Sequence, residues 1–200
     1  QVYDRKDMNS IIIRIPEQIN ECKELTEIDF SGLTLEGEIP SSFSELTKLT
    51  YIRLCQSMSN NTTGLTGEIP DLNKMENLSQ LDLSHNSLTG EIPNLQKNRK
   101  LTELELSNNS LTGEIPDFTN HLQLKWIALS NNNLYGRLPE FSSTKLQWLK
   151  LSNNNLEDSI PASYAVLLKQ LVSLNLYNNR LSGKLPEEIL ISPEFPLFVS

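Results

Sequence analysis

The sequence predicts a solenoid of the α/β class, a right-handed arc with a parallel sheet of short strands on its concave side and irregular or 3₁₀ structure on its convex side. Three observations predict it. Eight of the ten prolines follow Ile or Leu at intervals of 22 to 30 residues, leucines recur between them in the pattern L-x-x-L-x-L, and an asparagine and a glycine follow most of these stretches at fixed distances. A regular period of about 20 to 50 residues indicates a repeat architecture.

Aligned on the prolines, the chain contains seven copies of L-x-x-L-x-L-x-x-N-x-L-x-G-x-I-P, for example from Leu101 to Pro116. The alternating leucines predict a strand whose leucines point inward, and strands of successive copies stack into one parallel sheet. One copy cannot bury its leucines, whereas seven together can. A second apolar column on the convex side follows the prolines at Ile19, Phe43, Leu72, Leu95, Phe118, Phe141, Tyr164 and Ile189.

The asparagine that follows each strand is interpreted as structural. Its amide can satisfy backbone groups of the tight turn in its own and in the adjacent copy, which predicts a ladder of asparagines along the solenoid. The glycine of the pattern stands where a turn needs a positive φ or where coils approach closely. The periodicity alone explains both columns, so neither is assigned a binding role.

This pattern resembles the leucine-rich repeat, and its Gly-x-Ile-Pro ending resembles the plant-type subclass found in receptor-like kinase ectodomains and in polygalacturonase-inhibiting proteins. The resemblance covers roughly residues 11 to 190. It implies an extracellular, non-enzymatic module that binds a protein partner on its concave face. The expected organisation is an N-terminal cap with a half repeat over 1–20, seven repeats over 21–186 and a C-terminal cap over 187–200.

Composition and motifs argue against several other classes of protein. The net charge of −8 has the wrong sign for gripping nucleic acid, and the apolar runs are too short for a membrane span. His85 and His121 lack metal-ligand spacing. The letters of a hydrolase triad occur in Asp82, Ser84 and His85, but one strand cannot give the triad its converging geometry. We therefore predict no enzyme, no catalytic residue, no metal and no cofactor.

The two cysteines are expected to be free, because they belong to different faces of the coil. Cys22 is predicted to be a buried thiol on the convex side, and Cys55 to face the concave side. Between Cys55 and Gly64 lies an insertion of six residues relative to the other copies, which is either a functional loop or drift. Polygalacturonase inhibitors have a similar early irregularity.

Four N-x-[ST] sequons favour an exported protein. They make the chain a candidate glycoprotein, and we expect it to be secreted into the apoplast or cell wall. The candidate glycosylation sites are Asn60, Asn61, Asn77 and Asn108.

The solvent-facing strand positions form two columns that run along the sheet. In the early copies both columns are mainly acidic, with one arginine, and in the later copies they are mainly aromatic and basic. Trp126 and Trp148 occupy equivalent positions in adjacent strands, which predicts rings about 5 Å apart. Exposed tryptophans beside lysines are typical of an interface hot spot. The alternative is a self-contained pair that stabilises the sheet. The predicted partner-binding residues are Trp126, Trp148, Lys125, Lys150, Tyr51, Arg53, Asp82, Glu103, Glu105 and Tyr177.

The resemblance and the two columns favour three functions. In each of them the protein is expected to be a monomer. The first is a secreted protein like the polygalacturonase inhibitors, which hold a cell-wall pectinase on the concave face. The second is the ectodomain of a receptor-like kinase or receptor-like protein that binds a peptide or a co-receptor. The third is ice binding, which needs a long file of threonines, whereas Thr66, Thr89 and Thr112 form a file of only three.

Overall fold

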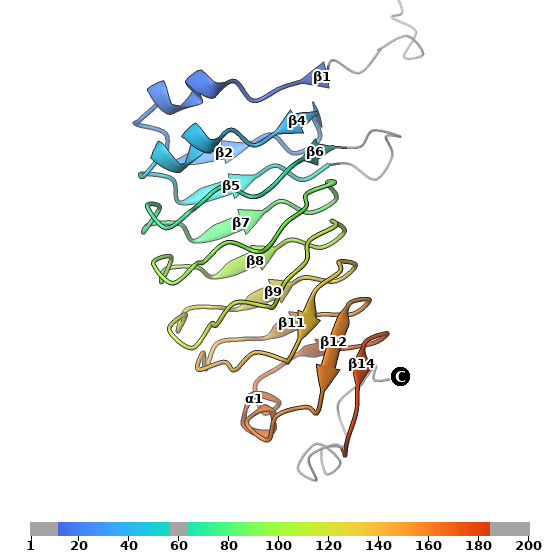
Figure 1. Cartoon of the computed structure of the whole chain (residues 1–200). Helices are drawn as coiled ribbons and strands as arrows, with labels where there is room; N and C mark the ends of the chain where they lie inside the picture. The colour runs from blue at the N-terminus through green and yellow to red at the C-terminus, as the bar shows by residue number, and fades with distance from the viewer. Residues whose placement is uncertain (1–11, 57–63, 185–200) are drawn as a thin grey trace, which may run out of the picture.

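The fold is a stack of coils around a continuous parallel sheet (Figure 1). It is a computed structural model that describes residues 12–56 and 64–184. One short strand from each of seven coils enters the sheet, in the spatial order β13-β11-β9-β8-β7-β5-β2. These strands are β2 (Glu27–Asp29), β5 (Tyr51–Arg53), β7 (Gln80–Asp82), β8 (Glu103–Glu105), β9 (Trp126–Ala128), β11 (Trp148–Lys150) and β13 (Ser173–Asn175). The predicted solenoid is confirmed.

The register of the sheet aligns equivalent positions of successive repeats. Tyr51 pairs with Gln80, Gln80 with Glu103, Glu103 with Trp126, and Trp126 with Trp148. The middle residue of each strand points into the core, and the two flanking residues face outward. The columns predicted from the sequence are therefore real files of side chains along the sheet.

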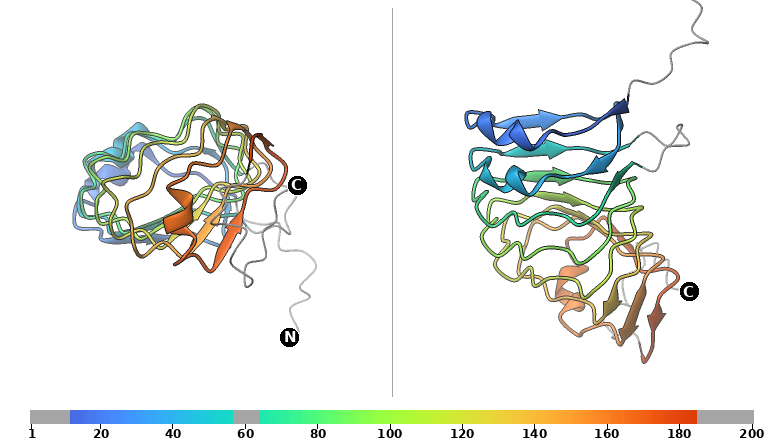
Figure 2. Two further views of the ribbon diagram at one scale, coloured as in Figure 1. Left: turned by 90° about the horizontal axis from the view of Figure 1, so that it is seen from below. Right: turned by 45° about the horizontal axis from the view of Figure 1, so that its top comes forward.

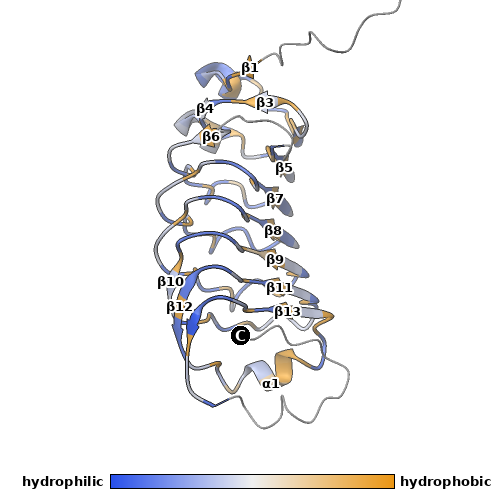
Figure 3. Cartoon of the chain, turned by 90° about the vertical axis from the view of Figure 1, so that its right-hand side faces the viewer, coloured by the Kyte–Doolittle hydropathy of each residue, from blue (hydrophilic) through white to orange (hydrophobic). Residues whose placement is uncertain are grey.

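The opposite side of each coil has less regular structure. Seen along the stack, the coils superimpose around a common axis (Figure 2), and short strands line the side away from the main sheet (Figure 3). The 3₁₀ helices η1 (Glu17–Glu21) and η2 (Ser41–Glu45) each begin after a proline with extended dihedral angles. The other elements are α1 (Tyr164–Leu167), β1 (Ile12–Ile13), β3 (Thr34–Leu35), β4 (Gly37–Glu38), β6 (Leu65–Thr66), β10 (Tyr135–Gly136), β12 (Asn155–Asp158) and β14 (Arg180–Leu181).

Leucines and isoleucines of every coil form one continuous core. The convex apolar column closes it from behind, with Phe43, Leu72, Leu95, Phe118 and Tyr164 buried and Ile19 and Phe141 half-buried. At the N-terminal end of the described residues, β1 pairs in parallel with β3 of the next coil. Ile189 and the expected C-terminal cap lie outside the described residues.

The asparagine ladder is present at Asn86, Asn109, Asn132, Asn154 and Asn179, each bonded to its own and to the preceding coil. At Asn132 the Nδ2 donates to the carbonyls of Leu106 at 3.0 Å and Leu129 at 3.1 Å, and the Oδ1 accepts the N–H of Leu111 at 3.0 Å. One side chain thus satisfies backbone groups of two coils, as the sequence predicted.

A second, outer ladder runs beside the first on residues with positive φ. Asn131 Nδ2 donates to Asn108 Oδ1 at 2.9 Å, and Asn153 Nδ2 donates to Asn131 Oδ1 at 2.7 Å. Asn178 continues this chain, and His85 takes the asparagine position at its other end. Asparagine suits this turn because it tolerates the left-handed region better than most residues.

Gly90 shows why the pattern requires glycine. Its φ is +74°, and a Cβ built on it would lie 2.8 Å from Cγ of Glu68 in the preceding coil. The positive φ therefore disfavours any side chain here, and a Cβ would in addition force the Glu68 side chain to move.

The expectation that Cys22 is buried is wrong. Its column is fully buried at Leu46 and Met75, but Cys22 is exposed because it belongs to the first described coil, where no described coil covers it from the other side. Cys55 is half-buried, and both cysteines are free, as expected.

His121 is a buried polar residue on the convex side. Its Nε2 lies 3.0 Å from the carbonyl of Leu95, while its Nδ1 has no partner among the described residues. Burial lowers the pKa of this imidazole; the Leu95 carbonyl and Asp117 act in the opposite direction. The neutral ring therefore donates from Nε2 to the Leu95 carbonyl, and burial disfavours the addition of a second proton at Nδ1 although the Phe118 carbonyl acts in its favour.

Removing one rung of the buried ladder should destabilise the whole stack. We expect Asn132→Ala to lower the free energy of unfolding by about 2 to 4 kcal/mol, because several buried backbone groups lose their partner. Asn133 is the matched control: its side chain is exposed and makes no hydrogen bond to a described residue. Asn133→Ala should change stability by less than about 0.5 kcal/mol in the same urea titration. Equal effects of the two substitutions would contradict the structural role of Asn132.

The lowered pKa of His121 predicts a pH dependence of stability. The unfolded chain binds a proton at this imidazole below about pH 6.5, whereas the folded chain resists it, so stability falls as the pH drops below about 6.5. His121→Asn should remove this part of the slope, because asparagine at the preceding equivalent position, Asn98, donates to two carbonyls without titrating. The free energy of unfolding is measured against pH from about 7.5 to 5 for the wild-type chain and for His121→Asn. The difference between these two curves is the contribution of His121. Parallel curves would refute the assignment.

Candidate functional site

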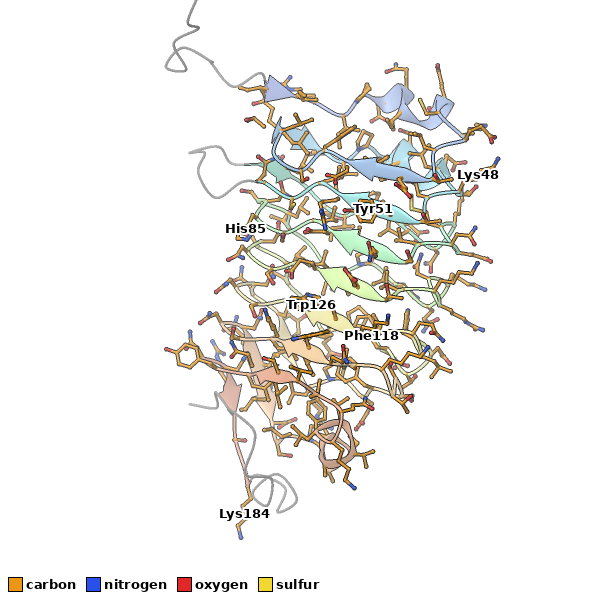
Figure 4. The ribbon with its side chains drawn as sticks, turned by 180° about the vertical axis from the view of Figure 1, so that it is seen from behind. Lys48, Tyr51, His85, Phe118, Trp126 and Lys184 are labelled. Carbon is orange, nitrogen blue, oxygen red and sulfur yellow. The ribbon has the colours of Figure 1, made fainter. Side chains whose placement is uncertain are left out.

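The outer face of the main sheet contains a hollow of about 250 Å³. It extends from Tyr51 on β5, across β7 and β8, to Trp126 on β9; Figure 4 labels both aromatic residues. Three steps between strands separate these two walls, which corresponds to about 14 Å. The hollow is lined by Tyr51, Ile52, Arg53, Gln80, Leu81, Asp82, Glu103, Glu105 and Trp126.

Arg53 is the one cation of this lining, and carboxylates of both neighbouring strands lie within ion-pair distance of it without a hydrogen bond to its buried Nε. Its Nε lies 3.6 Å from Asp82 Oδ2 and its Nη1 lies 3.9 Å from Asp29 Oδ2. Its guanidinium also lies over the ring of Tyr51, 5.3 Å from the centroid. Two carboxylates therefore surround the single positive charge of Arg53 before any ligand arrives, and together they exceed it.

The two carboxylates of β8 differ in their surroundings. Glu105 Oε2 accepts the indole N–H of Trp126 at 3.1 Å, and its Oε1 accepts the N–H of Ser107 at 3.2 Å. Glu103 is exposed and has no hydrogen bond or ion pair with a described residue. Since both side chains lie on the same face of one strand, β8 presents an anchored carboxylate and a free one side by side.

The tryptophan pair adjoins this hollow. The ring centroids of Trp126 and Trp148 lie 5.4 Å apart, as predicted from their positions in adjacent strands. The Lys150 Nζ lies 4.4 Å from the ring centroid of Trp126. Both indoles remain half-exposed, so the pair leaves apolar surface accessible at the centre of the sheet face.

Several acids at the strand ends also serve the fold. Asp82 Oδ1 accepts both the N–H of Ser84 at 3.0 Å and its hydroxyl at 2.7 Å, and Asp29 makes the same turn with Ser31. These hydrogen bonds lower the pKa of Asp29. The Ser84 hydroxyl is thus directed to Asp82 within a turn, which is not the hydrogen-bonding order of a hydrolase triad.

The structure brings together only part of the predicted set. Of the predicted partner-binding residues, Tyr51, Arg53, Asp82, Glu103, Glu105 and Trp126 line the hollow. Trp148 and Lys150 adjoin it through Trp126. Lys125 and Tyr177 do not line it, and Tyr177 lies beyond the end of strand β13. Sequence reasoning missed Gln80, although its position in the column between Tyr51 and Glu103 was a usable signal.

The two sequons within the described residues have different environments. Asn77 is exposed, and its Oδ1 accepts Lys100 Nζ at 2.7 Å, so its Nδ2 has no described partner. Asn108 is half-buried in the outer ladder, with Nδ2 3.3 Å from His85 Nε2 and Oδ1 bonded to Asn131. Asn60, Asn61 and most of the predicted insertion lie outside the described residues.

The short threonine file is tied to the backbone of the solenoid. The hydroxyls of Thr66, Thr89 and Thr112 each donate to the carbonyl of a glycine in the preceding coil, at 3.2 to 3.3 Å. These hydroxyls therefore contribute to coil stacking.

Two further searches concern residues 12–56 and 64–184 only. No group of three or more His, Cys, Asp or Glu side chains among them is placed to hold a metal ion. No helix in this part of the chain has the length and apolar character needed to cross a membrane.

Comparison with protein families identifies the repeat. The sequence pattern of the Leucine Rich Repeat family matches residues 24–46, 77–98, 100–122, 145–167 and 170–190, which together make up more than half of the chain. The chain belongs to the leucine-rich-repeat family. No curated protein gave a significant match to this leucine-rich-repeat sequence.

Solved leucine-rich-repeat structures resemble the chain closely. The Arabidopsis receptor kinase HAESA, in complex with the peptide hormone IDA and the co-receptor SERK1, is 33% identical over 93% of this chain and 30% of its own, with a TM-score of 0.81. The ectodomain of GASSHO1/SCHENGEN3 from Arabidopsis thaliana is 32% identical, covering 94% and 22%, with a TM-score of 0.75. PEPR1 with AtPEP1 is 28% identical, covering 94% and 32%, with a TM-score of 0.66. The chain spans about a third or less of the length of these proteins.

Proposed function

We propose that this leucine-rich-repeat chain is an extracellular, non-enzymatic recognition module that binds an extended peptide segment of a protein partner on its concave sheet face. The observation that carries the proposal is the hollow between Tyr51 and Trp126, which is continuous with the half-exposed Trp126–Trp148 pair. Aromatic side chains that leave apolar surface accessible at the centre of a polar face are typical of binding hot spots.

The geometry of the sheet favours recognition through side chains. Strands β5, β7, β8 and β9 are paired on both edges, so a ligand cannot add a strand to them and must contact the outward-facing residues. The hollow spans about 14 Å, which matches about four residues of extended chain at roughly 3.3 Å each. An extended segment that crosses these strands would meet one outward residue pair from each repeat.

The structural relatives support a peptide as the ligand class. HAESA has been solved with a peptide hormone, and it is 33% identical to this chain over 93% of the length of this chain. The sequence analysis placed inhibition of a polygalacturonase first. The observation that still favours it is the exposed acidic half of the same sheet face, including Glu103, and an assay of pectin hydrolysis by a polygalacturonase with and without the protein tests it.

Replacement of both tryptophans tests the proposed binding surface. We expect the Trp126→Ala/Trp148→Ala variant to bind a peptide selected on the wild-type protein from a displayed random library at least about 30-fold more weakly, which is about 2 kcal/mol. Far-UV circular dichroism should stay unchanged. Tyr135→Ala is the matched control, because Tyr135 is exposed on β10, away from the hollow. Unchanged affinity in the double variant, or an equal loss in the control, would contradict the proposal.

For glycosylation we propose that Asn77, and not Asn108, is modified. Asn77 exposes the amide nitrogen that carries a glycan, whereas a glycan on Asn108 would break the outer ladder. When the chain is expressed through a eukaryotic secretory pathway, peptide mass mapping should find glycan on the peptide of Asn77 and none on that of Asn108. Asn77→Gln should then remove it. Glycan on Asn108 with Asn77 bare would overturn this assignment.

A further inference from the structure

The hollow on the sheet face has aromatic walls at both ends and carboxylates between them. We propose that it receives the guanidinium of an arginine in the partner's extended segment. This inference rests on the proposed function and adds to it the chemistry by which the site selects its ligand.

The charges of the lining favour a cationic ligand group. Arg53 offsets only one of the two carboxylates beside it, Asp29 and Asp82, and Glu103 and Glu105 add two further negative charges to the hollow. Glu103 is exposed without a described partner, and each oxygen of Glu105 has only one described hydrogen bond. A carboxylate oxygen can accept a further hydrogen bond, so both side chains can receive donors from a ligand.

The spacing of these two carboxylates suits a planar group with several donors. Glu103 and Glu105 are two residues apart on one face of β8, about 6.5 Å along the strand. A guanidinium presents five N–H donors in a fixed plane and can bond two carboxylates at once, whereas an ammonium acts as a point charge. The preference for arginine over lysine follows from this difference.

The aromatic wall next to β8, Trp126 on β9, can complete such a site, whereas Tyr51 lies two strands from β8 and its ring already faces Arg53. Arginine stacks favourably on tryptophan and tyrosine rings, and the protein already makes contacts of this kind, with Arg53 over Tyr51 and Lys150 over Trp126. The Trp126 indole contacts both Glu105, through its N–H, and Lys150, whose Nζ lies over the ring. Among the described residues no ion pair joins Lys150 to Glu103 or Glu105, so neither glutamate is neutralised by this lysine.

Other ligand groups fit this lining less well. An acidic side chain would meet Asp82, Glu103 and Glu105 with no free cation among the lining residues. An apolar side chain would cover Glu103 and remove its water without replacing the lost hydrogen bonds, which is costly for a charged group. The charge complementarity thus points to one occupant.

The test uses the full chain and a random dodecapeptide library displayed on phage. Peptides captured by the wild-type protein should be enriched in arginine. The tightest peptide is then synthesised in two forms, with arginine and with citrulline, which keeps the shape of the side chain but has no charge. The citrulline form should bind the wild-type protein at least 10-fold more weakly. Against Glu103→Gln/Glu105→Gln, the two forms should differ by less than 2-fold.

Glu91→Gln is the control variant, because Glu91 is exposed outside the hollow, and it should retain the full 10-fold difference. Thermal unfolding of each variant checks that the fold is kept. If peptides are captured through the tryptophan pair but the citrulline form binds equally well, the arginine inference is overturned and the proposed function stands. If the library yields no peptide at all, the proposed function fails and the inference fails with it.

Discussion

The buried asparagine amide between successive coils is the interaction on which the rest of this structure depends. Strands of three residues and sharp turns leave backbone carbonyls inside the stack that water cannot reach. Asn132 bonds to carbonyls of its own coil and of the coil before it, and it accepts an N–H from the preceding turn. Repeating this contact fixes the offset between coils, whereas leucines alone would tolerate sliding because hydrophobic burial has no preferred direction.

The fixed offset is what makes the sheet face useful for recognition. It places Tyr51, Gln80, Glu103 and Trp126 side by side although 75 positions separate the first from the last in the sequence. The inward leucines carry the stability, so the outward residues can vary without loss of the fold. Each repeat then contributes a residue pair to the surface. A hollow arises where the aromatic side chains of Tyr51 on β5 and Trp126 on β9 flank the smaller side chains of β7 and β8.

The repeat made much of the structure predictable. Strand positions, the file of ladder asparagines and the Trp126–Trp148 pair follow directly from the alignment, because equivalent residues must stack in a solenoid. The hollow could not be predicted in the same way, since it depends on how side chains three strands apart are oriented. Cys22 was misjudged because a column describes an average coil, and an end coil lacks one neighbour. The sequence predicted only a binding role for Asp82, whereas the structure shows that it also accepts two hydrogen bonds from Ser84 in a turn.

Recognition on the concave sheet face requires the bound segment to lie across strands β5 to β9, and its position can be measured. A nitroxide label placed next to the arginine of the selected peptide broadens the N–H signals of nearby residues in a ¹⁵N-labelled sample of the whole chain. Binding in the hollow should produce the strongest broadening at Gln80, Glu103 and the indole of Trp126. Broadening centred instead on Tyr135 and Arg137, at the strands on the other side of the coils (Figure 3), would show that the concave face is not the recognition surface.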